Sequence, residues 1–114
     1  MLSKNAWTAV KATIPDGGTL SDVICKAGYT NIAFIVAAGA EGVALNFQAC
    51  DTQTGTFVDV FDNAGVALVV TIAATTRAIG LDPTVTARLA AFPYIRLKTA
   101  VQAGALPITV CLSA

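Results

Sequence analysis

The stretch Val43-Ala44-Leu45-Asn46-Phe47-Gln48-Ala49-Cys50 alternates in polarity from one residue to the next. Successive side chains of a β-strand point to opposite faces, so such an alternation separates two sets of side chains. One set is Val43, Leu45, Phe47 and Ala49, and the other is Ala44, Asn46, Gln48 and Cys50. The pattern predicts a half-buried strand with its first set in a core.

The rest of the chain favours strands as well. Val, Ile and Thr are abundant, whereas the helix-favouring residue Glu occurs only at Glu41. Clusters of Gly, Pro, Asp and Asn recur at short intervals and divide the chain into seven or eight strand-sized segments. Besides the opening stretch, the candidate segments for these strands are residues 7–14, 20–24, 32–36, 57–61, 66–72, 76–81, 94–98 and 108–112.

One short helical turn is expected within residues 84–92. Asp82 would cap it, because Pro83 can occupy the first helical position. Short strands in a single chain of 114 residues predict an all-β antiparallel sandwich or jelly roll, with a small open barrel as the competing architecture. We assign residues 7–114 to this one domain and residues 1–6 to a flexible N-terminal arm.

The composition indicates a surface that meets other protein. Apolar residues make up 55% of the chain, and charged residues make up 12%, about half of the usual share. Polar side chains are then too few to cover the outside, and a contiguous apolar patch marks an interface. We therefore expect self-association, as a dimer or trimer, or docking on another protein.

The sequence does not indicate binding to nucleic acid, insertion into a membrane or secretion. Seven basic and seven acidic residues give a formal net charge of zero, and the basic residues are scattered, so no nucleic-acid surface is expected. The longest apolar runs, at residues 32–40 and 66–74, are far shorter than the roughly 20 residues of a membrane-spanning helix. The N-terminus lacks the apolar segment of a signal peptide, so we expect a protein that is made in the cytoplasm and not secreted.

Metal, cofactor and redox chemistry have no motif in this sequence. The cysteines Cys25, Cys50 and Cys111 are widely spaced, and the chain contains no histidine to complete a zinc site. We expect no metal and no cofactor, and we expect free thiols, with one disulfide plus one free thiol as the alternative.

Catalysis is not expected either. Without histidine, the commonest general base near neutral pH is missing. A carboxylate mechanism would require Asp51, Asp59 and Asp62 to converge, yet each has a simpler explanation in a turn or on a solvated face. Asp59, Asp62 and Asn63 could also offer oxygens to calcium, but residues 62–65 are more simply a hairpin turn.

Four side chains are candidate protein contacts. Tyr94, Arg96 and Lys98 share one face of a predicted strand and form a polar and aromatic stripe. Trp7 could anchor the arm on another subunit or close one end of the core. Alternatively, Tyr94, Arg96 and Trp7 could line the sugar site of a carbohydrate-binding or adaptor module.

Four segments together resemble a known group of proteins. In order, they are Leu45-Asn46-Phe47-Gln48-Ala49, Thr56-Phe57-Val58-Asp59-Val60-Phe61-Asp62, Ala78-Ile79-Gly80-Leu81-Asp82-Pro83 and Phe92-Pro93-Tyr94-Ile95-Arg96-Leu97-Lys98. They look like the small β-sandwich virion proteins of tailed bacteriophages, among them capsid decoration or cement proteins. The resemblance spans about residues 20–112 and rests on strands and turns.

This resemblance implies a jelly-roll-like virion structural protein on the capsid surface. Such a protein would bridge neighbouring major capsid subunits and stiffen the shell, and the family implies no catalytic residues. The implied partners are the major capsid protein and further copies of this chain. Multivalent docking on a repeating lattice suits a surface of low charge, because avidity does not require strong individual contacts.

Overall fold

The computed structural model of the protein describes residues 7–114. Its fourth strand, β4 (Ala44–Cys50), comes from the alternating stretch, and Leu45, Phe47 and Ala49 are buried as predicted. Val43 was wrongly placed in the core: it precedes the strand and is 68% exposed. The predicted arm, residues 1–6, lies outside the described residues.

Eight further strands surround β4. They are β1 (Trp7–Ile14), β2 (Ile24–Cys25), β3 (Asn31–Val36), β5 (Val58–Asp59), β6 (Val69–Thr71), β7 (Arg77–Gly80), β8 (Tyr94–Lys98) and β9 (Leu106–Ser113). Strands β5 and β6 pair with different parts of β4, both on the side opposite β8. Residues 7–114 thus form nine strands, one more than the upper limit of the predicted seven or eight.

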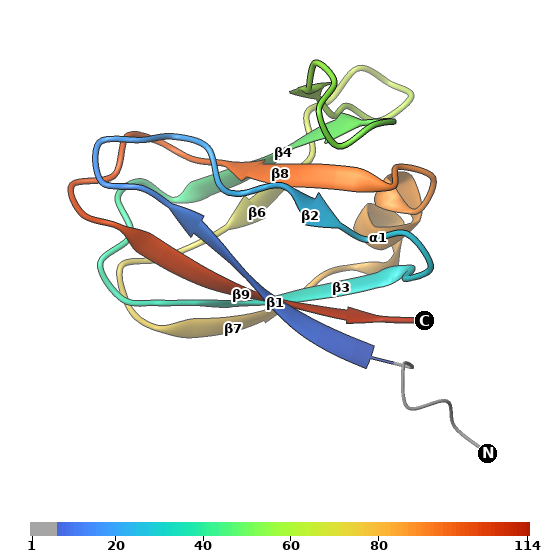
Figure 1. Ribbon diagram of the computed structural model, residues 1–114. Helices are drawn as coiled ribbons and strands as arrows, with labels where there is room; N and C mark the ends of the chain where they lie inside the picture. Colours follow the sequence, from blue (N-terminus) through green and yellow to red (C-terminus); the bar gives the residue numbers. More distant parts are fainter. Residues whose placement is uncertain (1–6) are drawn as a thin grey trace.

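The strands form two antiparallel sheets, in the orders β1-β9-β3-β7 and β2-β8-β4-β5, with β6 beside β4. The pairing is nested: the first strand pairs with the last, the second with the eighth, and the third with the seventh. Figure 1 shows the two sheets stacked, with β4 and β8 above and β3 and β7 below. This is the strand arrangement of a jelly roll, and the prediction of an all-β sandwich is confirmed.

The core lies between the inner faces of the two sheets. Phe34 of one sheet stacks on Phe47 of the other, with ring centroids 6.0 Å apart. Val110 lies opposite Phe34 and Leu97 lies opposite Phe47 in the strand register, and both are completely buried. Apolar side chains at every second position thus supply the burial that holds the sheets together.

One helix, α1 (Pro83–Leu89), covers an end of the sandwich (Figure 1). It begins at Pro83 as predicted but has seven residues, about two turns instead of one. Asp82 is the N-cap residue as predicted, but its carboxylate makes no capping hydrogen bond. The main-chain carbonyl of Asp82 accepts hydrogen bonds from the Val85 and Thr86 amides instead, and the buried Leu89 attaches the helix to the core.

All three cysteines are free. Cys25 on β2 and Cys50 on β4 both lie opposite Tyr94, which occupies the strand between them. They are therefore two strand spacings, about 10 Å, apart, which is farther than a disulfide can reach. Cys111 belongs to the other sheet. Within residues 7–114, no helix has the length and hydropathy to cross a membrane.

Candidate functional site

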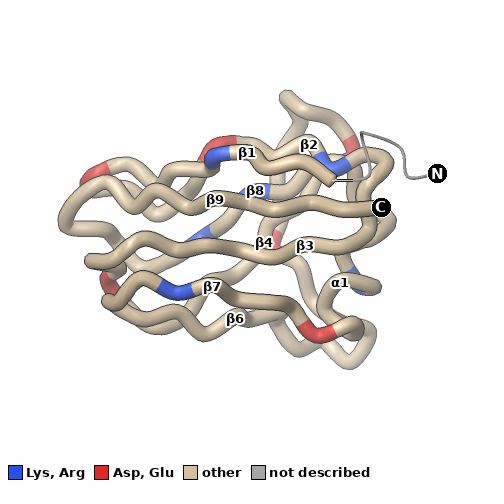
Figure 2. Tube along the Cα trace, turned by 90° about the horizontal axis from the view of Figure 1, so that it is seen from below, with Lys and Arg blue, Asp and Glu red and all other residues tan. Residues whose placement is uncertain are grey.

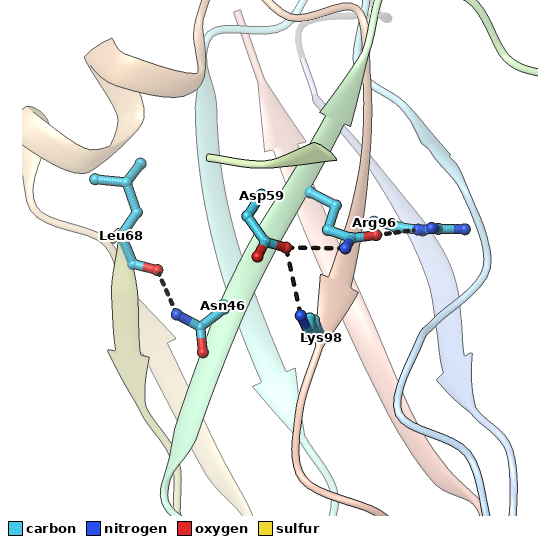
Figure 3. A network of polar contacts seen from close by, with 6 residues as sticks. Asn46, Asp59, Leu68, Arg96 and Lys98 are labelled. Atoms are coloured by element: carbon cyan, nitrogen blue, oxygen red, sulfur yellow. Dashed lines mark hydrogen bonds and ion pairs between the residues drawn. The ribbon is translucent and has the colours of Figure 1, made fainter. Parts of the chain in front are cut away.

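The outer face of the β2-β8-β4-β5 sheet carries a network of polar side chains. The strand register aligns them in rows: Lys98 lies opposite Asn46, and Arg96 lies opposite Gln48, which in turn lies opposite Asp59. Figure 3 shows Asp59, Arg96 and Lys98 close together, whereas Asn46 points to the main-chain carbonyl of Leu68, to which it donates a hydrogen bond of 3.1 Å. The predicted stripe on β8 is thus one side of a larger polar surface.

Gln48 is at the centre of this network. Its amide nitrogen donates to Asp59 Oδ1 at 2.9 Å, and its amide oxygen accepts from Arg96 Nε at 2.7 Å. Lys98 Nζ lies 3.4 Å from the same Asp59 oxygen and completes an ion pair. Both members of that pair are nearly half exposed, so the pair orients the side chains more than it stabilises the fold.

The aromatic ring of Phe57 packs against the guanidinium group of Arg96. The guanidinium carbon lies 4.8 Å from the centre of the Phe57 ring, which is within cation–π range. Phe57 belongs to the loop that precedes β5, and its ring is only half-buried. Arg96 is therefore fixed by Gln48 on one side and by an aromatic ring on the other, while its remaining donors stay free for a partner.

The electrostatics of the site keep Asp59 ionised. The hydrogen bond from Gln48, followed by the charge of Lys98, holds the pKa of the Asp59 carboxyl below its usual value. A general acid requires the opposite shift. Asp59 consequently serves as an acceptor for its neighbours.

The other acidic candidates are occupied or separate. Asp62 Oδ1 accepts hydrogen bonds from the Ala64 and Val66 amides, both at 2.9 Å, inside the predicted hairpin turn. Asp51 lies in the exposed segment after β4, where its carboxylate accepts a weak hydrogen bond from Cys50 Sγ. Within residues 7–114, no group of three Cys, Asp or Glu side chains is arranged to hold a metal ion.

A shallow hollow lies beside the network. Its volume is about 180 Å³, and it is lined by Asn46, Phe47, Asp59, Val60, Ala67 and Lys98. Sites for small molecules usually measure about 300–1,000 Å³. The hollow therefore fits a protruding side chain of a partner better than a free ligand.

The structure divides the four predicted contact residues between two faces. Tyr94, Arg96 and Lys98 share the outer face of β8, and Tyr94 is half-buried between Cys25 and Cys50. Trp7 lies on β1 in the opposite sheet, is 69% exposed, and does not close the core. Trp7 thus cannot line a single sugar site together with Tyr94 and Arg96.

Sequence reasoning missed the partners of the stripe. Alternation did place Gln48 on the outer face of its strand, but it could not show that Arg96 and Asp59 flank it. That requires the register between β4, β5 and β8. Nothing in the local sequence of Phe57 indicates its contact with Arg96.

Nested antiparallel strand pairs in two stacked sheets make this chain an all-β jelly-roll domain. It is similar in fold to the SPBc2 prophage-derived protein YomS, known from a crystal structure: the TM-score is 0.56, the match covers 100% of both chains, and 9% of residues are identical. At this identity the likeness shows a shared fold. No protein-family model matches the chain, and a search of curated proteins found no match.

Proposed function

We propose that this chain is a non-enzymatic phage virion protein that decorates the capsid and stabilises it by bridging neighbouring major capsid subunits. The observation that carries the proposal is the jelly roll, which is shared over the full length of the chain with a protein of prophage origin. The resemblance of four segments to small virion proteins of tailed phages supports the same role.

The polar face supports a role in docking. Arg96 is held by Gln48 and Phe57, so little side-chain freedom remains to be lost when a partner binds. Arginine and tyrosine are also the residues most often found at the energetic centre of protein interfaces. On a capsid, many copies of a modest contact of this kind would add up to stable decoration.

The alternative role in carbohydrate binding has less support. Its proposed residues lie on two different sheets, and the hollow beside Asp59 is small for a sugar. A glycan array tests this alternative directly. Clear hits that disappear in a Tyr94→Ala variant would favour a tail or fibre module over a capsid protein.

Co-sedimentation with purified empty capsids of the parent phage tests the main proposal. We expect the wild-type protein to pellet with capsids and to raise the temperature at which they disrupt. Arg96→Ala should weaken capsid binding at least about tenfold, because it removes a central charged contact. Arg77→Ala is the matched control, since it removes the same group from an exposed position on β7 in the other sheet.

Thermal melting should first establish that both variants are folded. The proposal fails if the wild-type protein never pellets with capsids. The assignment of the polar face to the contact fails if Arg96→Ala binds capsids as tightly as Arg77→Ala does.

A further inference from the structure

The outer face of the β1-β9-β3-β7 sheet differs sharply from the polar face. Its side chains form rows across the strands, set by the register: Ala9, Cys111, Ala33 and Gly80 in one row, and Lys11, Thr109, Ile35 and Ala78 in the next. A third row contains Trp7, Ser113 and Asn31. Lys11 is the only charged side chain in these rows.

Figure 2 shows this sheet from below, and its two central strands, β9 and β3, carry no charged residue along their length. An antiparallel sheet face that meets water normally bears polar and charged side chains. Here Ile35 is 45% exposed and Trp7 is 69% exposed instead. The face has the composition of a surface that another sheet covers.

The outer face of the β1-β9-β3-β7 sheet has both protruding side chains and a hollow. A hollow of about 170 Å³ lies at the Trp7 end and is lined by Trp7, Asn31, Ile32, Ala33, Cys111, Leu112 and Ser113. Trp7 and Ile35 stand above neighbours that are small. The same face thus offers both protrusions and space, which is the condition for self-complementary contact.

We propose that this face binds the same face of a second copy of the chain, about a two-fold axis parallel to the strands and between β9 and β3. The axis places each β1 over the β7 of the other copy. Lys11 then lies over the partner copy's Ala78, and Ile35 lies over Thr109, so each larger side chain meets a smaller one. Two sheets packed in this way form an aligned sandwich between copies.

The available area matches this contact. Strands β1, β9, β3 and β7 have eight, eight, six and four residues, so a strand spacing of about 4.8 Å and a rise of about 3.4 Å per residue give a projected area of about 420 Å². The accessible area is larger because side chains add relief. It approaches the roughly 600 Å² per partner found in the smallest stable interfaces.

Charge favours a second copy too. The two Lys11 side chains lie on opposite edges of the contact, about 14 Å apart, at three strand spacings. This separation exceeds the Debye length of about 8 Å at physiological ionic strength, so their repulsion is screened. Each Lys11 also donates to Thr109 Oγ1 of its own chain, which holds it along the face.

Light scattering coupled to size-exclusion chromatography measures the contact without any capsid, so its outcome is separate from that of the capsid experiment. We expect a dimer for the wild-type protein. Ala33→Arg, at the centre of the face, should raise the dimer dissociation constant at least about 30-fold. Thr71→Arg, at an exposed strand position of the other sheet, should leave the dissociation constant unchanged.

A charge pair tests the proposed axis. Ala78→Lys places a second cation opposite Lys11 and should weaken the dimer, whereas Ala78→Glu places an anion there and should preserve or strengthen it. Ala78 is exposed on the edge strand β7, so both variants should fold. Equal effects of the two substitutions would overturn the axis.

Trp7 is the only tryptophan and reports on the face directly. Its emission should shift to shorter wavelength, and its quenching by acrylamide should fall, as the wild-type protein dimerises. A wild-type monomer at all concentrations overturns the proposal. A dimer that survives Ala33→Arg overturns it as well. If the wild-type protein is a monomer and Ala33→Arg abolishes its binding to capsids, the face binds a capsid subunit and not a second copy of the chain.

Discussion

Lys26 is a buried lysine that has no acidic partner among residues 7–114. Its side chain is only 1% exposed, and its ammonium donates one hydrogen bond, of 3.3 Å, to the main-chain carbonyl of Ala90. Ala90 ends helix α1, where the carbonyl groups carry partial negative charge. This contact attaches the helix to the loop after β2, but burial lowers the pKa of Lys26 from its ordinary value of 10.5.

The lowered pKa predicts a pH-dependent stability. Between the pKa of the folded state and 10.5, the unfolded chain binds more protons than the folded chain, so stability rises with pH through this interval and levels off above 10.5. Lys26→Met removes the charge and keeps the side-chain volume. We expect the variant to be at least as stable as the wild type at neutral pH and to lose this advantage as the pH rises.

Thermal melting from neutral to alkaline pH, with reductant to protect the thiols, measures the effect. Arg77→Met is the control, because Arg77 is exposed and lies outside the rows of the proposed dimer contact. A constant difference between Lys26→Met and wild type at all pH values would contradict the prediction.

The connection between β5 and β6 depends on one carboxylate. Asp62 Oδ1 accepts from the Ala64 and Val66 amides, while the Asp62 amide donates to the Val66 carbonyl at 2.8 Å. Gly65 has φ of +81°, which side chains rarely permit. The hydrogen bonds that the carboxylate accepts, chiefly the one from the Val66 amide, lower the pKa of Asp62. The turn predicted from Asp-Asn-Ala-Gly is confirmed, and its stability comes from this side chain.

Asp62→Ala should lower the melting temperature by a few degrees, because two amides lose their acceptor. Asp62→Asn, which keeps an acceptor oxygen, should retain most of the stability. Because the folded-state pKa of Asp62 is lowered, its contribution is present above the unfolded value of 3.8 and is lost as the pH falls through the folded-state pKa. The wild type should therefore approach the stability of Asp62→Ala in acid.

Melting curves across this pH range and hydrogen exchange at Val66 test both statements. Exchange that is equally slow in wild type and Asp62→Ala would show that the carboxylate does not hold the turn.

The whole molecule is organised by contacts between distant parts of the chain. β1 pairs with β9, so Trp7 lies opposite Ser113, and β9 also pairs with β3. In a nested fold of this kind, few pairs form by local turns alone, and the cost of closing long loops precedes most of the burial. β9, the most C-terminal of the described strands, lies between β1 and β3 in its sheet.

We expect refolding in milliseconds to seconds, as for other domains dominated by non-local strand pairs. Stopped-flow circular dichroism after dilution from denaturant measures the rate. Folding within microseconds would contradict the role of long-range pairing.

Ile108→Val in β9 should lower the free energy of unfolding by about 0.5–1.5 kcal/mol, because Ile108 is completely buried.

The sequence by itself determined the class of fold, the approximate strands and most of the core. Those features follow from local patterns: a two-residue period places Leu45 and Phe47 inside, and turn residues such as Asp62 and Gly65 end the strands. The same reasoning failed at Val43 and at the Asp82 cap, because position relative to the strand end and main-chain bonding override residue type.

Only the tertiary structure decided which strands are neighbours. Register brings Asp59, Gln48 and Arg96 together, puts Trp7 on the other sheet, and buries Lys26 beneath the end of α1. It also assembles, from strands far apart in the chain, an outer face whose rows carry Lys11 as their only charged side chain. The physical reason is that pairing between distant segments depends on the packing of the whole core, which no local sequence pattern encodes.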